Sequence, residues 1–204
     1  MKKEEREPMK RMIAPLVAAL LGTAATGAAA QTAQTASYTL DPMHTFPSVE
    51  FSHFGVSTWK GKFTKTAGKV TLDRAARTGT VDVTIDPSSL DFGVPVMNGH
   101  ARGESWFNVE KFPTITYRGQ LAKFNGDVPT AVEGQLTMMG VTRPVTLQLT
   151  QFKCITHPMN KRDMCGGDAT ATLNRRDFNI TNLPAAAVGD EIKLTLQVEG
   201  FRDQ

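Results

Sequence analysis

The chain has 204 residues, with 23 Lys and Arg against 20 Asp and Glu, which gives a formal net charge of +3. Five of the basic residues but only three of the acidic ones fall within the first 30 positions. The remainder is therefore nearly neutral, and it lacks the basic surplus typical of proteins that bind nucleic acid. Its length suits one domain with a sizeable core.

Residues 1–30 are typical of an export signal. Lys10 and Arg11 precede the apolar run 12–21, and Ala28–Ala30 forms an A-x-A cleavage site. The pattern predicts a signal peptide over 1–30 and a single mature domain over 31–204, located in the periplasm or secreted. A buried helix is the alternative for the apolar run, and the true start, Met1 or Met9, stays open. No later segment approaches the ~18 apolar residues of a membrane span, so no stable membrane insertion is expected.

Apolar and polar residues alternate in several later segments. The alternation covers residues 81–85, 114–118, 132–138, 145–150 and 192–199. A period of two indicates a strand with one dry face and one wet face. Gly140 separates two of these segments and predicts a short turn between them. Repeated one-faced strands indicate an antiparallel barrel or sandwich, and either encloses apolar space.

Residues 87–112 interrupt the strand pattern. Ser88, Ser89 and Asp91 are candidate caps for a short helical turn, and residues 95–104 are a candidate helix. The adjacent aromatic residues 106 and 107 follow, outside any clear strand. They are interpreted either as a plug packed on the barrel end or as a lid over a cavity, and the two roles are compatible.

Two cysteines, Cys154 and Cys165, flank a polar loop between a strand ending near Lys153 and another starting near Asp168. Cysteines across the mouth of a hairpin predict a disulfide in an oxidising compartment. A metal site that includes His157 is the alternative. It is disfavoured because zinc normally takes four ligands and the spacing is not a paired C-x-x-C. A redox-active pair is disfavoured for the same lack of C-x-x-C.

Several motifs, taken in chain order, resemble one known family. They are Asp41–His44, Val49–Ser57, Gly61–Phe63, Asn98–Arg102, Trp106–Pro113, Gly134–Val145 and Asn174–Phe178. Together they resemble the YceI-like family of polyisoprenoid-binding proteins, and the string L-T-x-x-G-V-T-R-P-V is among the most specific. The resemblance implies an all-β fold, an eight-stranded antiparallel lipocalin-like barrel with short helices between strands in the region 87–112. It also implies a lumen that holds an isoprenoid chain, such as a quinone tail.

The chain departs from the family pattern in places. Asn179 stands where Gly is usual, although Asn also tolerates a left-handed backbone. The Cys154 and Cys165 pair is not general to the family. These departures bear on the head-group preference and on the shape of the barrel mouth.

Ring-bearing and flexible side chains suit a lumen just wide enough for one slim ligand. The candidate ligand-binding residues are Phe51, His53, Phe54, Trp59, Phe63, Arg102, Trp106, Phe107, Tyr117, Leu136, Met138, Asn174, Arg175 and Phe178. Ordinary core packing is the alternative for each of them. Asn174 and Arg175 are expected either to face a head group or to satisfy backbone carbonyls. The expected partner is a polyisoprenoid or quinone-type lipid, with no other cofactor and no metal.

Other functions stay open. A secreted hydrolase needs a nucleophile beside a base, and no G-x-S-x-G or H-E-x-x-H motif occurs. A metal or haem site would require His44, His53 and His100 to converge. It is disfavoured because the sequence shows no set of carboxylate or sulfur ligands at close spacing to complete such a site. An outer-membrane barrel suits the strand period, but 7% aromatic residues are too few for two girdles. A binding module without a fixed ligand and a homodimer also stay open.

Overall fold

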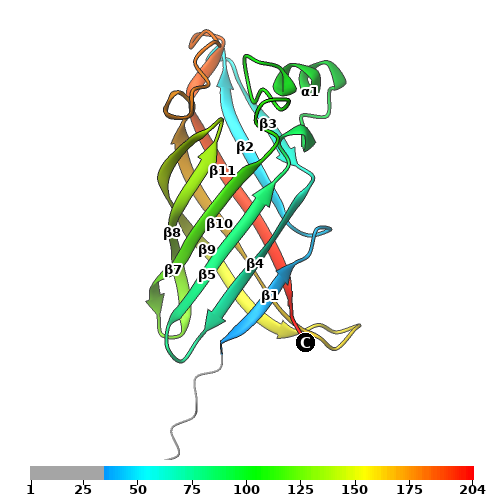
Figure 1. Ribbon diagram of the computed structural model, residues 1–204, viewed down its shortest axis with the longest axis vertical. Coiled ribbons are helices and arrows are strands. Elements are labelled where there is room, and N and C mark those ends of the chain that lie inside the picture. Colours follow the sequence, from blue (N-terminus) through cyan, green and yellow to red (C-terminus); the bar gives the residue numbers. More distant parts are fainter. Residues whose placement is uncertain (1–34) are drawn as a thin grey trace, which may run out of the picture. The chain divides into compact units, whose positions relative to one another are not determined.

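The computed structural model describes residues 35–204, and the predicted signal peptide at 1–30 lies outside the described residues. The described part is an antiparallel β-barrel with one α-helix at one end (Figure 1). Within residues 35–204, no helix is long and apolar enough to cross a membrane. The strands therefore carry both the architecture and the interior of the domain.

The strands are paired antiparallel throughout. They are β1 (Ala36–Leu40), β2 (Phe46–His53), β3 (Ser57–Phe63), β4 (Thr66–Asp73), β5 (Thr78–Ile85), β6 (Leu90–Asp91), β7 (Ile115–Asn125), β8 (Val128–Met138), β9 (Val141–Thr156), β10 (Asp163–Asn174) and β11 (Val188–Arg202). The helices are η1 (Pro87–Ser89), α1 (Pro95–Arg102) and η2 (Arg175–Phe178).

The barrel closes through eight strands. Their order is β1-β4-β5-β7-β8-β9-β10-β11, and β11 returns to β1 with Tyr38 opposite Arg202. Strand β2 continues along β11 where β1 stops, and β3 pairs with β2. This arrangement confirms the predicted eight-stranded antiparallel barrel with short helices in the region 87–112.

The segment from η1 to α1 fills the place where β3 diverges from the barrel wall. There β6 pairs with β3 through two residues, with Phe63 opposite Leu90. The cap of η1 is Asp86, whose carboxylate accepts a hydrogen bond from the Ser88 amide at 2.8 Å. The expectation that Ser88, Ser89 or Asp91 caps this turn is therefore wrong.

Helix α1 is shorter than expected. It begins with Pro95 in its first turn, where the missing N–H has no intrahelical role. It ends at Arg102, two residues before the predicted end, because the Gly103 backbone is extended.

A tight turn joins β8 to β9, as Gly140 predicted. Met138 is opposite Val141, so Met139 and Gly140 alone form the connection. Their φ angles are +52° and +74°. Positive φ at both central positions matches a type I′ turn, whose twist suits a two-residue hairpin. Asn179, which follows η2, likewise has φ +63° and a left-handed conformation.

The alternation in the sequence places apolar side chains inside the barrel. Val132, Leu136 and Met138 are buried, whereas Glu133 and Gln135 between them are exposed. The same alternation holds along β9 for Val145 and Leu147. One continuous hydrophobic cluster therefore lines the interior and extends to Trp106 and Phe107.

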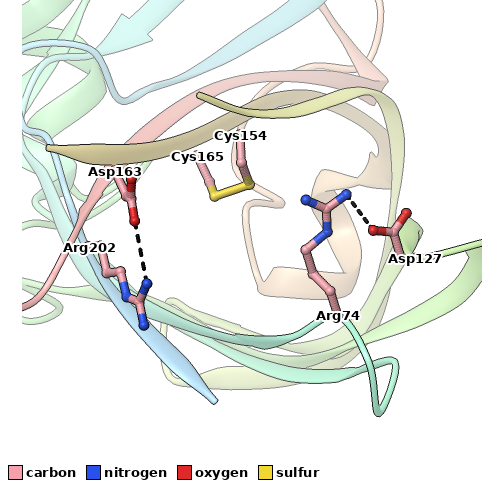
Figure 2. Close-up of a disulfide and its surroundings, with 6 residues drawn as sticks. All are labelled: Arg74, Asp127, Cys154, Asp163, Cys165 and Arg202. Atoms are coloured by element: carbon pink, nitrogen blue, oxygen red, sulfur yellow. Dashed lines mark hydrogen bonds and ion pairs between the residues drawn. A yellow bond between two sulfur atoms is a disulfide. The ribbon is translucent and has the colours of Figure 1, made fainter. Parts of the chain in front are cut away.

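The predicted disulfide is present. Cys154 and Cys165 are opposite each other on β9 and β10, with 4.0 Å between their Cα atoms. The two strands run past both cysteines to Thr156 and Asp163, so the expected strand limits near 153 and 168 are wrong. The bridge lies at the barrel end opposite α1, which we call the disulfide end (Figures 1 and 2).

Two ion pairs join neighbouring elements at the disulfide end, as Figure 2 shows. Arg74 in the β4–β5 turn pairs with Asp127 in the β7–β8 turn. Arg202 on β11 pairs with Asp163 on β10, with 3.4 Å between the charged atoms. Both pairs are exposed, so each contributes little to stability.

Loss of the disulfide will destabilise the domain. The bridge closes a sequence separation of 11 residues, which the chain-entropy relation values at about 3 kcal/mol. A Cys154→Ser/Cys165→Ser variant is expected to unfold at lower urea concentration than the oxidised protein, and reduced wild type should match it. Equal midpoints for the variant and the oxidised protein would contradict this expectation.

Candidate functional site

The candidate site is a cavity of about 220 Å³ inside the barrel. Val188 and Gly200, near the two ends of β11, both line it. A strand rises about 3.3 Å per residue, which separates these two residues by roughly 40 Å along the strand. With the usual strand tilt, the cavity is roughly 30 Å long along the barrel axis. Its volume lies below the ~300–1,000 Å³ of drug-sized ligand sites. A long and narrow space of this kind fits one thin chain.

Eight of the fourteen candidate residues line this cavity. They are Phe51, Phe63, Trp106, Phe107, Tyr117, Leu136, Met138 and Arg175. Trp106 and Phe107 are buried at the α1 end, where Phe63 packs against Phe107 with 5.8 Å between ring centroids. These two residues therefore serve as a plug for that end of the barrel.

The other six candidates do not line the cavity. They are His53, Phe54, Trp59, Arg102, Asn174 and Phe178. Trp59 lies behind the wall residue Phe51, with 6.5 Å between ring centroids. His53 packs on Trp59 at 5.1 Å, while Phe54 in the β2–β3 turn is 60% exposed. These rings extend the hydrophobic contacts from the cavity wall to the surface.

Of the remaining three candidates, two make hydrogen bonds to the backbone and one is a core residue. Arg102 donates to the carbonyl oxygen of Ser88 at 3.1 Å and so ties α1 to η1. Asn174 caps η2 by accepting a hydrogen bond from the Arg176 amide at 2.9 Å. Phe178 is fully buried in the hydrophobic cluster. Asn174 was expected to face a head group or to satisfy backbone carbonyls, and the contact that the structure shows is with a backbone amide instead.

Most of the lining residues are aliphatic, and nearly all of these were absent from the residues predicted to bind the ligand. These side chains occupy alternate positions on β4, β5, β8, β9 and β11, and they include Val70, Leu72, Val81, Val83, Ile85, Val132, Leu147, Leu149, Ile192, Leu194 and Leu196. Much of the signal that identifies them was present in the sequence, because period-two alternation selects the inward face of a strand.

Tyr117 places its phenol in the apolar interior, where the hydroxyl group hydrogen-bonds to backbone carbonyl oxygens. Its hydroxyl lies 2.9 Å from the carbonyl oxygen of Val145 and 3.1 Å from that of Val132. Burial, with a smaller contribution from Glu133, raises the pKa of Tyr117 to about 12. Gly134 makes room for this ring, because a Cβ there would lie 2.7 Å from the Tyr117 Cζ. Tyr117 is therefore a neutral wall residue.

Arg175 is the most deeply buried charge in the described part of the chain, at 2% exposure. Its guanidinium donates to the carbonyl oxygens of Ile180, Leu183, Val188 and Gly189 at 2.5 to 3.3 Å. The side chain thus holds the loop between η2 and β11 against the α1 end of the cavity. Of its two expected roles, the structure shows the one that satisfies backbone carbonyls.

Asp190 supplies the counter-charge for Arg175. Its carboxylate lies 2.7 Å from Arg175 Nη2 and 2.8 Å from Arg176 Nε. Burial lowers the pKa of Arg175, and the Asp190 charge opposes that effect. The guanidinium therefore stays charged with its donors engaged.

The histidines do not gather into one site. His44 lies in the bend between β1 and β2, His53 lies against Trp59, and His100 is on α1. Within residues 35–204, the only group able to offer three metal ligands is Asp41, His44 and Glu199, whose ligand atoms lie within 4.8 Å of one another. This group is at the surface and is separate from the cavity.

His44 and Asp41 form a hydrogen-bonded ion pair, with 2.7 Å between Nδ1 and Oδ2. The hydrogen bond that His44 Nδ1 donates to the Asp41 carboxylate, together with the charges of Asp41 and Glu199, raises the pKa of His44. The bond fixes the bend between β1 and β2. The sequence carries no local signal for Glu199, because it approaches His44 only through the pairing of β11.

Comparison with known proteins identifies the family. The sequence profile described as a YceI-like domain matches residues 38–200. A UPF0312 protein of Yersinia pestis (strain Pestoides F) is 33% identical over 176 residues, which cover 85% of this chain and 90% of the relative. This chain belongs to the YceI-like family.

Solved structures show the same fold. The crystal structure of Burkholderia cenocepacia BcnA superposes with a TM-score of 0.63 at 22% identity, covering 78% of this chain and 98% of that one. A polyisoprenoid-binding domain from Saccharophagus degradans, implicated in plant cell wall breakdown, superposes at 0.57 with 16% identity and covers 81% and 98%. At these identities the likeness establishes the fold of the YceI-like barrel.

Replacement of Arg175 will loosen the loop that it holds. An Arg175→Met variant leaves buried carbonyls without donors, and we expect a loss of about 3 kcal/mol in unfolding free energy. Arg176→Met is the matched control, because Arg176 is exposed and its ion pair contributes no more than about 1 kcal/mol. Denaturant unfolding measures both, and equal losses would contradict the role assigned to Arg175.

The pKa of His44 will depend on Asp41. In NMR titrations the His44 midpoint is expected above the ordinary value of 6.5, and Asp41→Asn should lower it. A raised folded-state pKa means that the stabilisation is complete below the unfolded-state pKa and disappears as pH rises through the folded-state value. An unchanged midpoint in Asp41→Asn would contradict the assignment.

Proposed function

We propose that this protein is a carrier that encloses the hydrocarbon chain of a polyisoprenoid lipid in its barrel and performs no chemistry on it. The observation that carries the proposal is the continuous apolar lumen from Val188 to Gly200. Quinones with polyprenyl tails are the ligand type that we favour. The lumen surrounds a tail and leaves the head group at one end.

Burial of an isoprenoid tail supplies enough free energy for binding. Each buried CH₂ contributes about 0.8 kcal/mol, so about fifteen such groups contribute roughly 12 kcal/mol. This amount is comparable with the ~4–15 kcal/mol lost on association. A lumen with aliphatic walls can therefore hold a long tail without polar contacts along most of its length.

Two further observations support a binding role. The polyisoprenoid-binding domain of Saccharophagus degradans shares the fold. The cavity lining contains no histidine, serine, lysine or glutamate, and its cysteine is part of the disulfide. The lining therefore lacks the Ser–His and Cys–His pairs that many hydrolases use.

We further propose that the protein acts in the periplasm. The pattern of residues 1–30 is that of an export signal. The Cys154–Cys165 disulfide is of the kind that persists in oxidising compartments. A carrier there would shield a lipid tail from water outside the membrane.

Filling the lumen will weaken binding. Ala169 on β10 lines the cavity, and its neighbour Thr170 is exposed on the outer face. Ala169→Phe is expected to weaken binding of a polyprenyl quinone at least tenfold, because the added ring occupies the space of the tail. Quenching of Trp106 and Trp59 fluorescence measures the binding.

Thr170→Phe is the matched control and should bind like wild type. Circular dichroism of both variants checks that the barrel remains folded. The carrier proposal fails if the quinone does not quench wild-type fluorescence and if organic extraction of protein made in its own host yields no isoprenoid.

A further inference from the structure

One polar side chain in the cavity wall has no partner. Thr66, the first residue of β4, lines the cavity and is 4% exposed. Its hydroxyl oxygen is enclosed and makes no hydrogen bond among the described residues. Buried hydroxyl groups are nearly always paired, because an unpaired one loses its hydrogen bonds to water without replacement. Thr66 therefore requires an explanation.

Three other polar side chains in the wall, Thr45, Tyr117 and Arg175, have partners within the protein. Thr45 donates from its hydroxyl to the carbonyl oxygen of Glu199 at 3.1 Å and accepts from the Glu199 amide at 3.3 Å. The Tyr117 hydroxyl and the Arg175 guanidinium have backbone carbonyl partners. Thr66 differs from these three residues because its hydroxyl has no protein partner among the described residues.

The strand register fixes the level of Thr66 in the barrel. Thr66 is opposite Ile85, and Ile85 is opposite Ile115, so the three side chains form one row across the wall. All three line the cavity. Ile85 directly precedes the segment that carries η1 and β6, so this row lies at the α1 end, close to Leu90 and Phe107.

Thr66 can present its hydroxyl to the lumen without a movement of the backbone. Threonine side chains occupy staggered rotamers, and a ~120° rotation about χ1 moves the hydroxyl into the place of the methyl group, while the methyl group takes the place of the hydrogen. The strand pairing of β4 with β5 is unaffected by such a rotation. A bound ligand can therefore receive this hydrogen bond at the cost of one rotamer change.

We propose that the ligand carries an uncharged oxygen, a hydroxyl or a carbonyl, that hydrogen-bonds to Thr66 inside the barrel. The polar end of the ligand then lies under the plug at the α1 end, and its tail extends toward the disulfide end. This inference rests on the proposed carrier function and specifies its ligand.

An anionic head group does not fit this place. The only cation in the cavity lining is Arg175. Its donors are directed to backbone carbonyls and to Asp190. A phosphate or carboxylate beside Thr66 would be buried without a counter-charge, which is strongly unfavourable.

The test compares two probes and one substitution. The probes are geranylgeraniol and the hydrocarbon in which hydrogen replaces its hydroxyl group. Their affinities are measured by displacement of a polyprenyl quinone that quenches tryptophan fluorescence. Thr66→Val keeps the shape of the side chain and removes its hydroxyl. We expect the alcohol to bind Thr66→Val about fivefold to tenfold more weakly than wild type, with the hydrocarbon bound equally or more tightly.

Thr71→Val on the same strand is the matched control. Thr71 lies between the wall residues Val70 and Leu72 and bonds to Thr80 on the outer face. It should change neither affinity. If Thr66→Val does not fold, Thr66→Ser against Thr66→Ala makes the same comparison, and only Thr66→Ser should favour the alcohol.

The outcomes separate this inference from the carrier function. An equal effect of Thr66→Val on both probes, or no effect on either, would overturn the inference, because a water or the wall would then satisfy the hydroxyl. Binding of both probes to wild type in that case would leave the carrier function intact. Failure of wild type to bind the quinone or either probe would overturn the carrier function itself.

Discussion

Closure of the sheet is the constraint on which the rest of this structure depends. When β11 pairs with β1, each of the eight barrel strands is hydrogen-bonded to a strand on either side. Alternate side chains must then point into an enclosed space. Unpaired polar groups are costly there, so most inward positions are apolar, and the Tyr117 hydroxyl and Arg175 guanidinium are paired with backbone carbonyls. The apolar lumen is thus a direct consequence of closure and of period-two alternation. Eight strands keep it narrow enough for a single chain.

The two ends of the barrel are built differently. At the α1 end, the wall opens where β3 leaves β4, and the segment from η1 to α1 lies there together with Trp106 and Phe107, which follow α1 and line the cavity. Arg175 fixes the adjacent loop through backbone carbonyls. At the disulfide end, Cys154 and Cys165 hold two long strands together. A polar end of the ligand under the plug and a tail directed toward the disulfide would use both features.

Much of the fold could be predicted from the sequence because its signals are local. Alternation identified the inward residues of β8 and β9, Gly140 located their turn, and the family motifs supplied the number of strands. The hairpin cysteines predicted their own pairing. The limits of β9 and β10 were misjudged because strand pairing continues beyond the cysteines through residues of mixed polarity, such as Ile155 and Asp163.

The site was less predictable because its key contacts join distant segments. Glu199 approaches His44, and Arg175 reaches Val188, only after the barrel has closed. The sequence could not tell that Phe51 lines the cavity and Trp59 does not, because both are aromatic. The difference arises because β3, which carries Trp59, does not pair with β4 and so diverges from the barrel wall. The sequence could not predict that the Thr66 hydroxyl lacks a partner, because this depends on which distant residues surround it in the fold.

Native mass spectrometry of the protein purified from its own host tests the central claim most directly. The account predicts a species heavier than the mature chain by the mass of one isoprenoid lipid, which is released when the protein is denatured. The Ala169→Phe protein prepared in the same way should have the mass of the chain alone. A wild-type protein that is always found without a lipid, and that gains none when incubated with polyprenyl quinone, would contradict the account.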